Sequence, residues 1–220
     1  MGAIYNIKYK KRYKLLIDKI SNWLLDKVVS GNKSEEEKEI LLFGITRIVE
    51  DIPKAIGIII ISTLLGILKE VAIVTVVLML YKTMTGGVHA KTNLGCFLYS
   101  LLFYLVIVYT SKFLVLTGVN KVGVYTIIYI FCMYTIFVYV PADVPEIPKV
   151  NIKLRRALKI KAIIVLNAIY IVGLIIIKDN IIQNLIIYSA FYISLMTTRT
   201  IYKLFRNQYG YETYIPDELI

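Results

Sequence analysis

Long uncharged, mostly apolar runs constrain this chain more than any other feature. Four runs of 16 to 20 residues lack charge, at 92–111, 122–140, 162–177 and 181–198. Because about 20 apolar residues in a helix cross the ~30 Å hydrocarbon core of a bilayer, such runs are typical of membrane spans. With 58% hydrophobic and 19% charged residues, the composition also excludes an intrinsically disordered chain. The expected fold class is all-α, a polytopic membrane protein.

Two shorter apolar runs, 55–68 and 71–81, come before these four. As helices they would reach only about 21 Å and 17 Å, so they form either a re-entrant hairpin or spans lengthened by their flanks. This makes about six hydrophobic segments. Ahead of them, residues 4–29 predict a helix with a basic face beside an aromatic and aliphatic face, and a second amphipathic helix is expected over 39–51. The first helix would lie in the bilayer interface or pack on the protein's own cytoplasmic face.

The basic residues divide unevenly between the two sides of the predicted membrane domain. Of the 26 Lys and Arg, 22 fall in 1–54, 82–91, 149–161 and the tail from Arg199, and 4 fall in the remaining connections. The positive-inside rule therefore predicts a multi-pass cell-membrane protein with both termini in the cytoplasm. We expect one domain, 1–220, made of cytoplasmic or interfacial helices (1–54), membrane segments (55–198) and a cytoplasmic tail (199–220). The net charge of +11 is explained by topology, so no nucleic-acid partner is expected.

One stretch at a predicted membrane boundary, residues 81–100, combines groups capable of chemistry. It holds His89, the single histidine, and Cys96, one of two cysteines, with Gly86-Gly87 just before the histidine. A cysteine attacks as the thiolate, and a neighbouring imidazole can take its proton and pass it to a leaving amine. His89 and Cys96 are thus a candidate nucleophile and base, although a lone histidine and a lone cysteine at this spacing are more often structural.

The spacing of seven residues requires a break in the helix between the two side chains. On one continuous helix they would be about 10.5 Å apart along the axis, too far for a hydrogen bond. The glycines and an N-cap at Thr92 or Asn93 would allow a loop around His89 and a helix starting near Asn93. Cys96 would then lie in the first turn, where the helix dipole favours a thiolate.

Other groups near this stretch have open roles at this level. Lys82 and Lys91 add positive potential, which would bind a substrate carboxylate or favour the thiolate. Backbone N–H groups around Gly95 would form an oxyanion hole. The third partner, which would orient the imidazole, is Thr92, Asn93 or Glu70, and the sequence does not choose among them. One histidine and one nearby cysteine cannot fill a zinc site, so no metal is expected. Cys132, inside an uncharged run, is expected to be a packing residue.

The run Gly86-Gly87-Val88-His89-Ala90 followed by Cys96 resembles the accessory gene regulator protein B (AgrB) family, membrane cysteine endopeptidases of Gram-positive bacteria. Supporting features are the apolar layout, Phe43-Gly44-Ile45, and Pro141-Ala142-Asp143 with Pro148-Lys149. The resemblance implies that His89 and Cys96 are the catalytic pair and that Gly86-Gly87 shape the loop. The family commonly has Arg seven residues before the histidine, where this chain has Lys82, which keeps the charge without the planar fork.

The resemblance also implies a substrate and a reaction. The substrate would be an AgrD-like propeptide whose acidic C-terminal tail is cleaved through an acyl-enzyme thioester, leading to a cyclic thiolactone autoinducing peptide for quorum sensing. The basic residues Lys149, Lys153, Arg155 and Arg156 would steer that tail, although positive-inside topology also explains them. No cofactor is implied. The partners are the propeptide and the lipid bilayer, and the family layout suggests a homodimer.

Two alternatives belong to other functional classes. A small multispan transporter would usually need ionisable groups inside its spans, and here Lys112 alone interrupts one, near an end. A non-catalytic membrane scaffold would tolerate replacement of Cys96.

Overall fold

The computed structural model describes residues 2–29, 34–90, 92–115, 118–145 and 148–214. Every regular element among them is a helix, which confirms the all-α class. The chain divides into two compact units, Met1–Leu64 and Leu65–Ile220. Three helices of the second unit are long and apolar enough to cross a membrane: α5 (Asn93–Phe113), α6 (Gly118–Tyr139) and Ile152–Ile176, which joins α7 (Ile152–Ile171) to the π-helix η2 (Val172–Ile176).

The first unit consists of α1 (Gly2–Val28) and α2 (Glu35–Leu64). Ser34 and Glu37 form a capping box at the start of α2, because Ser34 Oγ accepts from the Glu37 N–H and a Glu37 carboxylate oxygen accepts from the Ser34 N–H. The expected segments 39–51 and 55–68 form one helix up to Leu64, with Pro53 inside it. Proline removes one backbone hydrogen bond, and the apolar residues after it keep the remaining ladder intact. On α1, the large apolar side chains Leu15, Leu16, Ile20 and Trp23 are exposed.

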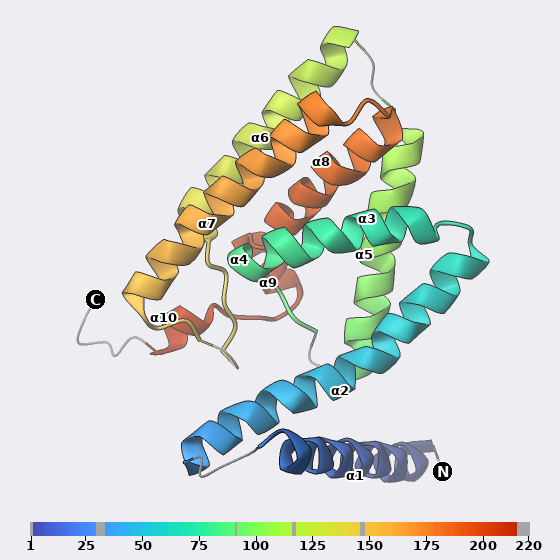
Figure 1. The fold of residues 1–220 in the computed structure, drawn as a ribbon, viewed down its shortest axis with the longest axis vertical. Coiled ribbons are helices and arrows are strands. Elements are labelled where there is room, and N and C mark those ends of the chain that lie inside the picture. The colour runs from blue at the N-terminus through green and yellow to red at the C-terminus, as the bar shows by residue number, and fades with distance from the viewer. Residues whose placement is uncertain (1, 30–33, 91, 116–117, 146–147, 215–220) are drawn as a thin grey trace. The chain divides into compact units, whose positions relative to one another are not determined.

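The second unit is organised around α8 (Asn180–Leu195), on which α3 (Leu68–Val77), α5, α6 and α7 all pack. Figure 1 shows α5, α6, α7 and α8 running in alternating directions. The helices α7 and α8 begin where N-caps satisfy their first N–H groups: Asn151 Oδ1 accepts from Lys153 and Leu154, and Asp179 Oδ1 accepts from Ile181 and Ile182. Residues 183–190 of α8 are all buried, although the helix is shorter than the three long apolar helices.

A helical segment from Leu68 to Thr85 leads toward the predicted site. It comprises α3 (Leu68–Val77), the π-helix η1 (Leu78–Lys82) and α4 (Thr83–Thr85). Tyr81, fully buried, packs in the main hydrophobic core, and its hydroxyl bonds the Ser194 hydroxyl of α8 at 3.0 Å. The segment is therefore anchored to the central helix just before the glycines that precede His89.

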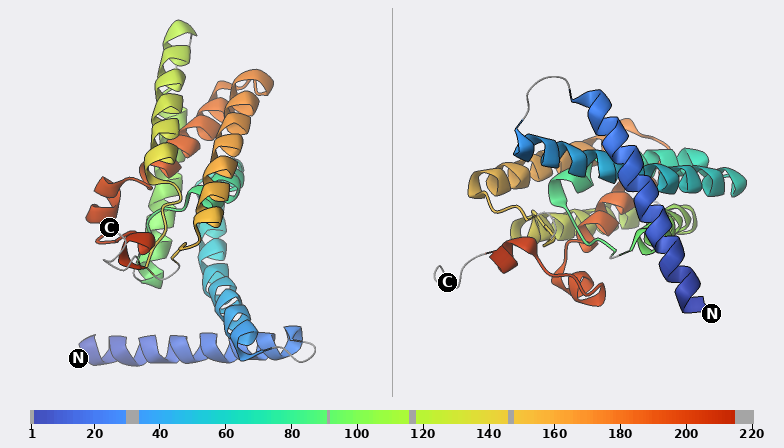
Figure 2. Two further views of the ribbon diagram at one scale, coloured as in Figure 1. Left: turned by 90° about the vertical axis from the view of Figure 1, so that its left-hand side faces the viewer. Right: turned by 90° about the horizontal axis from the view of Figure 1, so that it is seen from below.

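The alternating helices give the second unit two ends with different contents. One end holds the 86–90 loop, residues 140–145 and 148–151, α9 (Arg199–Leu204) and α10 (Gly210–Tyr214), which lie low in Figure 1 and face the viewer on the right of Figure 2. At the other end, Lys112 pairs with Glu70 at 2.5 Å, and Lys121 donates to Asn180 at 2.7 Å. His89 and Cys96 belong to the first end.

Candidate active site

Gly86 and Gly87 let the chain leave the helix and lie directly against another backbone. Gly86 has φ of 78°, and a Cβ built there would lie 2.1 Å from the carbonyl oxygen of Ala142. The Ala142 N–H donates to the Thr85 carbonyl at 2.8 Å, and the Gly87 N–H donates to the Ala142 carbonyl at 2.9 Å. Because only glycine tolerates this φ and this approach, the pair specifies where the following loop begins.

The loop that carries His89 is held at its backbone on two further sides. The Val88 N–H donates to the Met196 carbonyl, just after α8, at 3.3 Å. The carbonyl of His89 itself accepts from Asn207 Nδ2 at 2.7 Å, and the His89 side chain is exposed. The path of the loop is thus set by main-chain contacts, while the imidazole is at the surface.

Cys96 lies in the first turn of α5, as predicted. The helix starts at Asn93, and its N-cap is Thr92, whose Oγ1 accepts from the Gly95 N–H at 3.0 Å. The Cys96 N–H closes the first helical turn on the Thr92 carbonyl at 2.8 Å. Cys96 is free and partly exposed, whereas Cys132 is free and fully buried in the core. His89 and Cys96 are therefore separated by a loop and a helix start and do not share one continuous helix.

A small aromatic cluster joins the His89 loop to the start of α5. Val88, next to His89, is buried with Ala142, Val144, Tyr202 and Tyr209, and Tyr99, one turn after Cys96, packs against this cluster. The rings of Tyr202 and Tyr209 are stacked, with centroids 4.2 Å apart. Burial, first of all, raises the pKa of both phenols. Both hydroxyls therefore stay protonated, and they donate to the carbonyls of Asp143 and Thr197.

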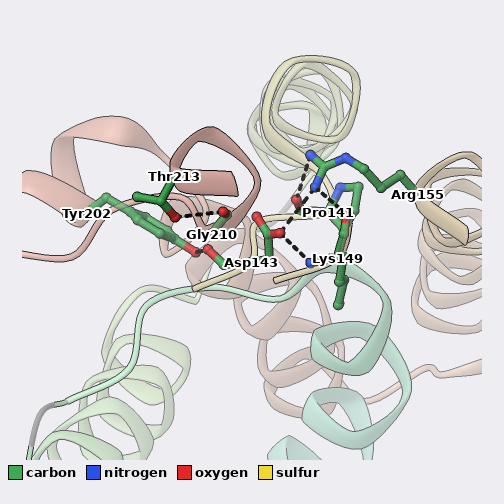
Figure 3. Close-up of polar contacts among 7 residues, drawn as sticks. All are labelled: Pro141, Asp143, Lys149, Arg155, Tyr202, Gly210 and Thr213. Atoms are coloured by element: carbon green, nitrogen blue, oxygen red, sulfur yellow. Dashed lines mark hydrogen bonds and ion pairs between the residues drawn. The ribbon is translucent and has the colours of Figure 1, made fainter. Parts of the chain in front are cut away.

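The segment around Asp143, which the His89 loop contacts through Ala142, is closed by an ion pair between the buried Asp143 and the partly exposed Arg155 (Figure 3). Arg155 of α7 donates to Asp143 Oδ2 at 3.3 Å, to the Lys149 carbonyl at 3.3 Å and to the Pro141 carbonyl at 3.4 Å. The Lys149 N–H donates to the same Asp143 oxygen at 2.7 Å. The Asp143 side chain is 0% exposed.

Comparison with known proteins identifies the family. The family model "Accessory gene regulator B" matches residues 17–199. An AgrB-like protein of Clostridium acetobutylicum is 27% identical over 176 residues, which cover 78% of this chain and 82% of the relative. Another, from Clostridium perfringens, is 24% identical over 148 residues, 66% of this chain and 69% of the relative. No solved structure matches. The chain belongs to the AgrB family.

Membership of the AgrB family supports a role in the processing of quorum-sensing propeptides of the agr type. Together with the three long apolar helices and the shorter α8, it also supports a membrane location. The number of spans, the cytoplasmic placement of the termini and the homodimer stay predictions.

The predicted basic residues of this AgrB-family chain occupy different surroundings. Lys153 and Arg156 are exposed on the first turns of α7, whereas Arg155 is bound to Asp143. Lys149 is half-buried, and burial lowers its pKa, although the charge of Asp143 opposes this effect. Lys82 ends η1 and is partly buried. Lys91 lies outside the described residues.

Two subsidiary expectations about the AgrB site change in the structure. Of the N–H groups around Gly95 that were expected to form an oxyanion hole, those of Gly95 and Cys96 donate to the Thr92 side chain and carbonyl, because they belong to a capped first turn. Glu70, one candidate to orient the imidazole, instead pairs with Lys112, sixteen residues beyond Cys96 on α5 and so about 24 Å away along the helix axis. Thr92 and Asn93 remain beside the site.

Sequence reasoning missed the groups that hold the loop in place. Ala142 and Met196 act through their backbones, which carry no sequence signal. Asn207 contacts a residue 118 positions away, and one sequence without contact information does not reveal such a pairing. The burial of Asp143, which lies between Pro141 and Pro145, was also not foreseen.

Proposed function

We propose that this AgrB-family protein is a membrane-embedded cysteine endopeptidase, with Cys96 as nucleophile and His89 as general base and acid. One observation carries the proposal: no continuous helix joins the two residues, and the loop that carries His89 and the first turns of α5 pack in one cluster. Val88, adjacent to His89, and Tyr99, one turn beyond Cys96, pack together with Tyr202 and Tyr209. This packing keeps the loop close to the first turn of α5.

The surroundings of Cys96 suit a nucleophile better than those of the second cysteine. Cys96 is partly exposed near a helix N-terminus, where the dipole favours an anion, while Cys132 is fully buried among apolar side chains. A peptide therefore has access to one thiol of the two. The exposed imidazole of His89 is at the same end of the unit.

The proposed reaction has two acyl-transfer steps. The Cys96 thiolate attacks the carbonyl carbon before the propeptide's tail, and the C–N bond breaks as the His89 imidazolium gives its proton to the leaving amine. The remaining thioester is then attacked by a thiol of the propeptide itself, whose proton passes to the now neutral His89 imidazole. A thiolactone ring closes, and Cys96 is released as the thiolate. Exclusion of water protects the thioester from hydrolysis during this exchange.

An acidic tail would be attracted to the basic surface at this end of the molecule. The exposed Lys153 and Arg156 are suited to this role, because their charges meet solvent, whereas Arg155 is already paired with Asp143. We assign to Lys82, Lys91 and Lys149 a supporting positive potential. We assign to Gly86 and Gly87 the shape of the loop.

The test is cleavage of a co-expressed AgrD-like propeptide at matched membrane levels of the protein. Cys96→Ala should abolish release of the tail, and His89→Ala should reduce it by about 100-fold or more. Cys132→Ala is the matched control and should cleave normally. Normal cleavage by Cys96→Ala would refute the proposal and favour a scaffold or transporter role.

A measurement of thiol reactivity tests the nucleophile without any substrate. An alkylating reagent should label Cys96 faster than Cys132, and His89→Ala should slow the labelling of Cys96 alone. Equal rates for the two thiols would contradict an activated Cys96.

A further inference from the structure

We propose that Asp143 and Arg155 are positioning residues of this site, and that the ion pair between the buried Asp143 and the partly exposed Arg155 holds the segment onto which the His89 loop is hydrogen bonded. This inference rests on the proposed function for its effect on catalysis. Neither residue touches the thiol or the imidazole in the contacts described above. They act through the backbone of 141–144.

The guanidinium of Arg155 closes the segment around Asp143. Arg155 reaches the carbonyls at both ends, Pro141 and Lys149, and the carboxylate of Asp143 between them. Its planar fork makes several directed bonds from one side chain, which a lysine ammonium on a flexible stem does not reproduce. The ring of Tyr211 lies 4.2 Å from the guanidinium carbon and covers it. The arginine is therefore held in one orientation.

Asp143 is held by hydrogen bonds both to its side chain and to its backbone. Its carboxylate accepts from Arg155 and from the Lys149 N–H, and its backbone carbonyl accepts from the Tyr202 hydroxyl at 3.1 Å and the Gly210 N–H at 3.4 Å (Figure 3). Contacts from α7, α9 and α10 thus converge on one residue. The position of its neighbour Ala142 follows from them.

Backbone hydrogen bonds link Ala142 to the start of the His89 loop. The carbonyl of Ala142 accepts from Gly87, its N–H donates to Thr85, and the two bonds bracket Gly86. His89 is two residues after Gly87. A shift of Ala142 therefore moves the start of the loop and, through it, the imidazole.

The burial of Asp143 argues for a specific role beyond packing. Its side chain is 0% exposed, and its Oδ1 has no hydrogen-bond partner among the described residues. A buried carboxylate with one oxygen unsatisfied is costly, and apolar residues of similar size often replace buried ion pairs without loss of stability. The carboxylate does provide a directional hold on Arg155 and on the Lys149 N–H, which an apolar side chain would not.

The experiment measures loop docking and catalysis separately in the full chain in lipid nanodiscs. Hydrogen exchange reports the amides of Gly87 and Ala142, and propeptide cleavage gives kcat and KM. Asp143→Asn should speed exchange of both amides by about tenfold or more, as expected when a local structure opens more easily. It should lower kcat by about 100-fold, because small misplacements of a reacting group have effects of that size. KM should stay within about threefold.

Further variants keep the result interpretable. Arg155→Lys retains the charge and loses the fork, so it should show the same effects in weaker form, and it replaces Asp143→Asn if that variant does not accumulate. Glu212→Gln is the matched control, because it removes an exposed ion pair with Arg199 at the same end, and it should leave both readouts unchanged. In substrate-free alkylation, Asp143→Asn should slow Cys96, and adding His89→Ala should slow it no further than His89→Ala alone.

Unchanged amide exchange in both Asp143→Asn and Arg155→Lys would overturn the inference, and so would faster exchange with a normal kcat. If Cys96→Ala still cleaves the propeptide, the proposed function fails instead. Exchange of the Gly87 and Ala142 amides would still decide whether the ion pair docks the loop.

Discussion

The two ends of the second unit differ in how their segments are joined. At the end that carries His89 and Cys96, the backbone of Gly86-Gly87 contacts the backbone of another segment. At the opposite end, polar side chains form hydrogen bonds with the ends of helices. Gly86 lies against Ala142 with no room for a side chain, and Gly87, next to it, lies against Met196. At the other end, Asn184 Nδ2 donates to the carbonyls of Ser111 and Leu114, at 2.9 and 3.2 Å, and Asn184 Oδ1 accepts from the Tyr125 hydroxyl. The glycine contact at the first end depends on an exact chain path, whereas the Asn184 contacts at the other depend on satisfied polar groups.

Because of this difference, we expect substitutions at one end to affect mainly the activity of the protein and substitutions at the other end to affect mainly its stability. A side chain added at the glycine contact would displace a loop that carries the proposed base, so we expect the loss mainly in catalysis. A polar group removed at the opposite end leaves buried partners unsatisfied, so we expect the loss mainly in stability. Substitutions at the two ends should therefore affect different measurements.

The largest effect is expected from Gly86→Ala. The added Cβ would lie 2.1 Å from the Ala142 oxygen at a φ of 78°, and strained backbone of this kind costs about 1–3 kcal/mol. Cleavage per inserted molecule should fall by about 100-fold, measured by release of the propeptide's tail. Gly123→Ala on α6, where a Cβ meets nothing within 4 Å, is the control. Equal activity of the two variants would remove the distinction between the ends.

The second prediction concerns the opposite end. Asn184→Leu should lower the free energy of unfolding by about 1–3 kcal/mol, because the Tyr125 hydroxyl and the Ser111 carbonyl lose Asn184 as their partner, while the Leu114 carbonyl keeps the Tyr188 hydroxyl. Denaturant unfolding in detergent measures this change. The folded fraction should cleave as fast as the unchanged protein. A catalytic defect in that fraction would show that the two ends are coupled.

A smaller effect is expected when charge is removed from the surface beside the site. The double variant Lys153→Gln with Arg156→Gln should raise KM for an acidic-tailed propeptide by about 3- to 10-fold at low salt, and the difference should shrink as salt screens the attraction. The value of kcat should not change. Lys178→Gln, an exposed lysine at the opposite end, should leave KM unaltered. If both variants raise KM alike, general charge and not this surface would explain the attraction.

The smallest effect is expected at Lys149. Burial lowers the pKa of its amine, so in the alkaline window between this pKa and the ordinary value the unfolded chain binds more protons than the folded one. Stability therefore rises with pH in that window, and Lys149→Gln should remove the rise while changing stability near neutral pH by less than about 0.5 kcal/mol. Unfolding measured from neutral to alkaline pH checks this. A steeper rise in the variant would contradict the assigned burial effect.

Several local features were predictable because their causes are local. The uncharged runs predicted apolar helices, since the length and the absence of charge are visible in any window of the chain. The break before Cys96 was predictable for the same reason: Gly86-Gly87 leave a helix easily, and Thr92 is a good cap for the helix at Asn93. The continuity of α2 through Pro53 was not, because local rules favour a break at proline.

The residue pattern by itself determined that this chain makes apolar helices and places a thiol in a helix start and an imidazole in a loop. Only the tertiary structure decided what holds that loop: Ala142 against Gly86-Gly87, Met196 and Asn207 at the backbone, and Arg155 on Asp143. The physical reason is that helix formation and capping depend on neighbours in sequence. Backbone docking and the ion pair depend on segments that meet only after the helices have packed.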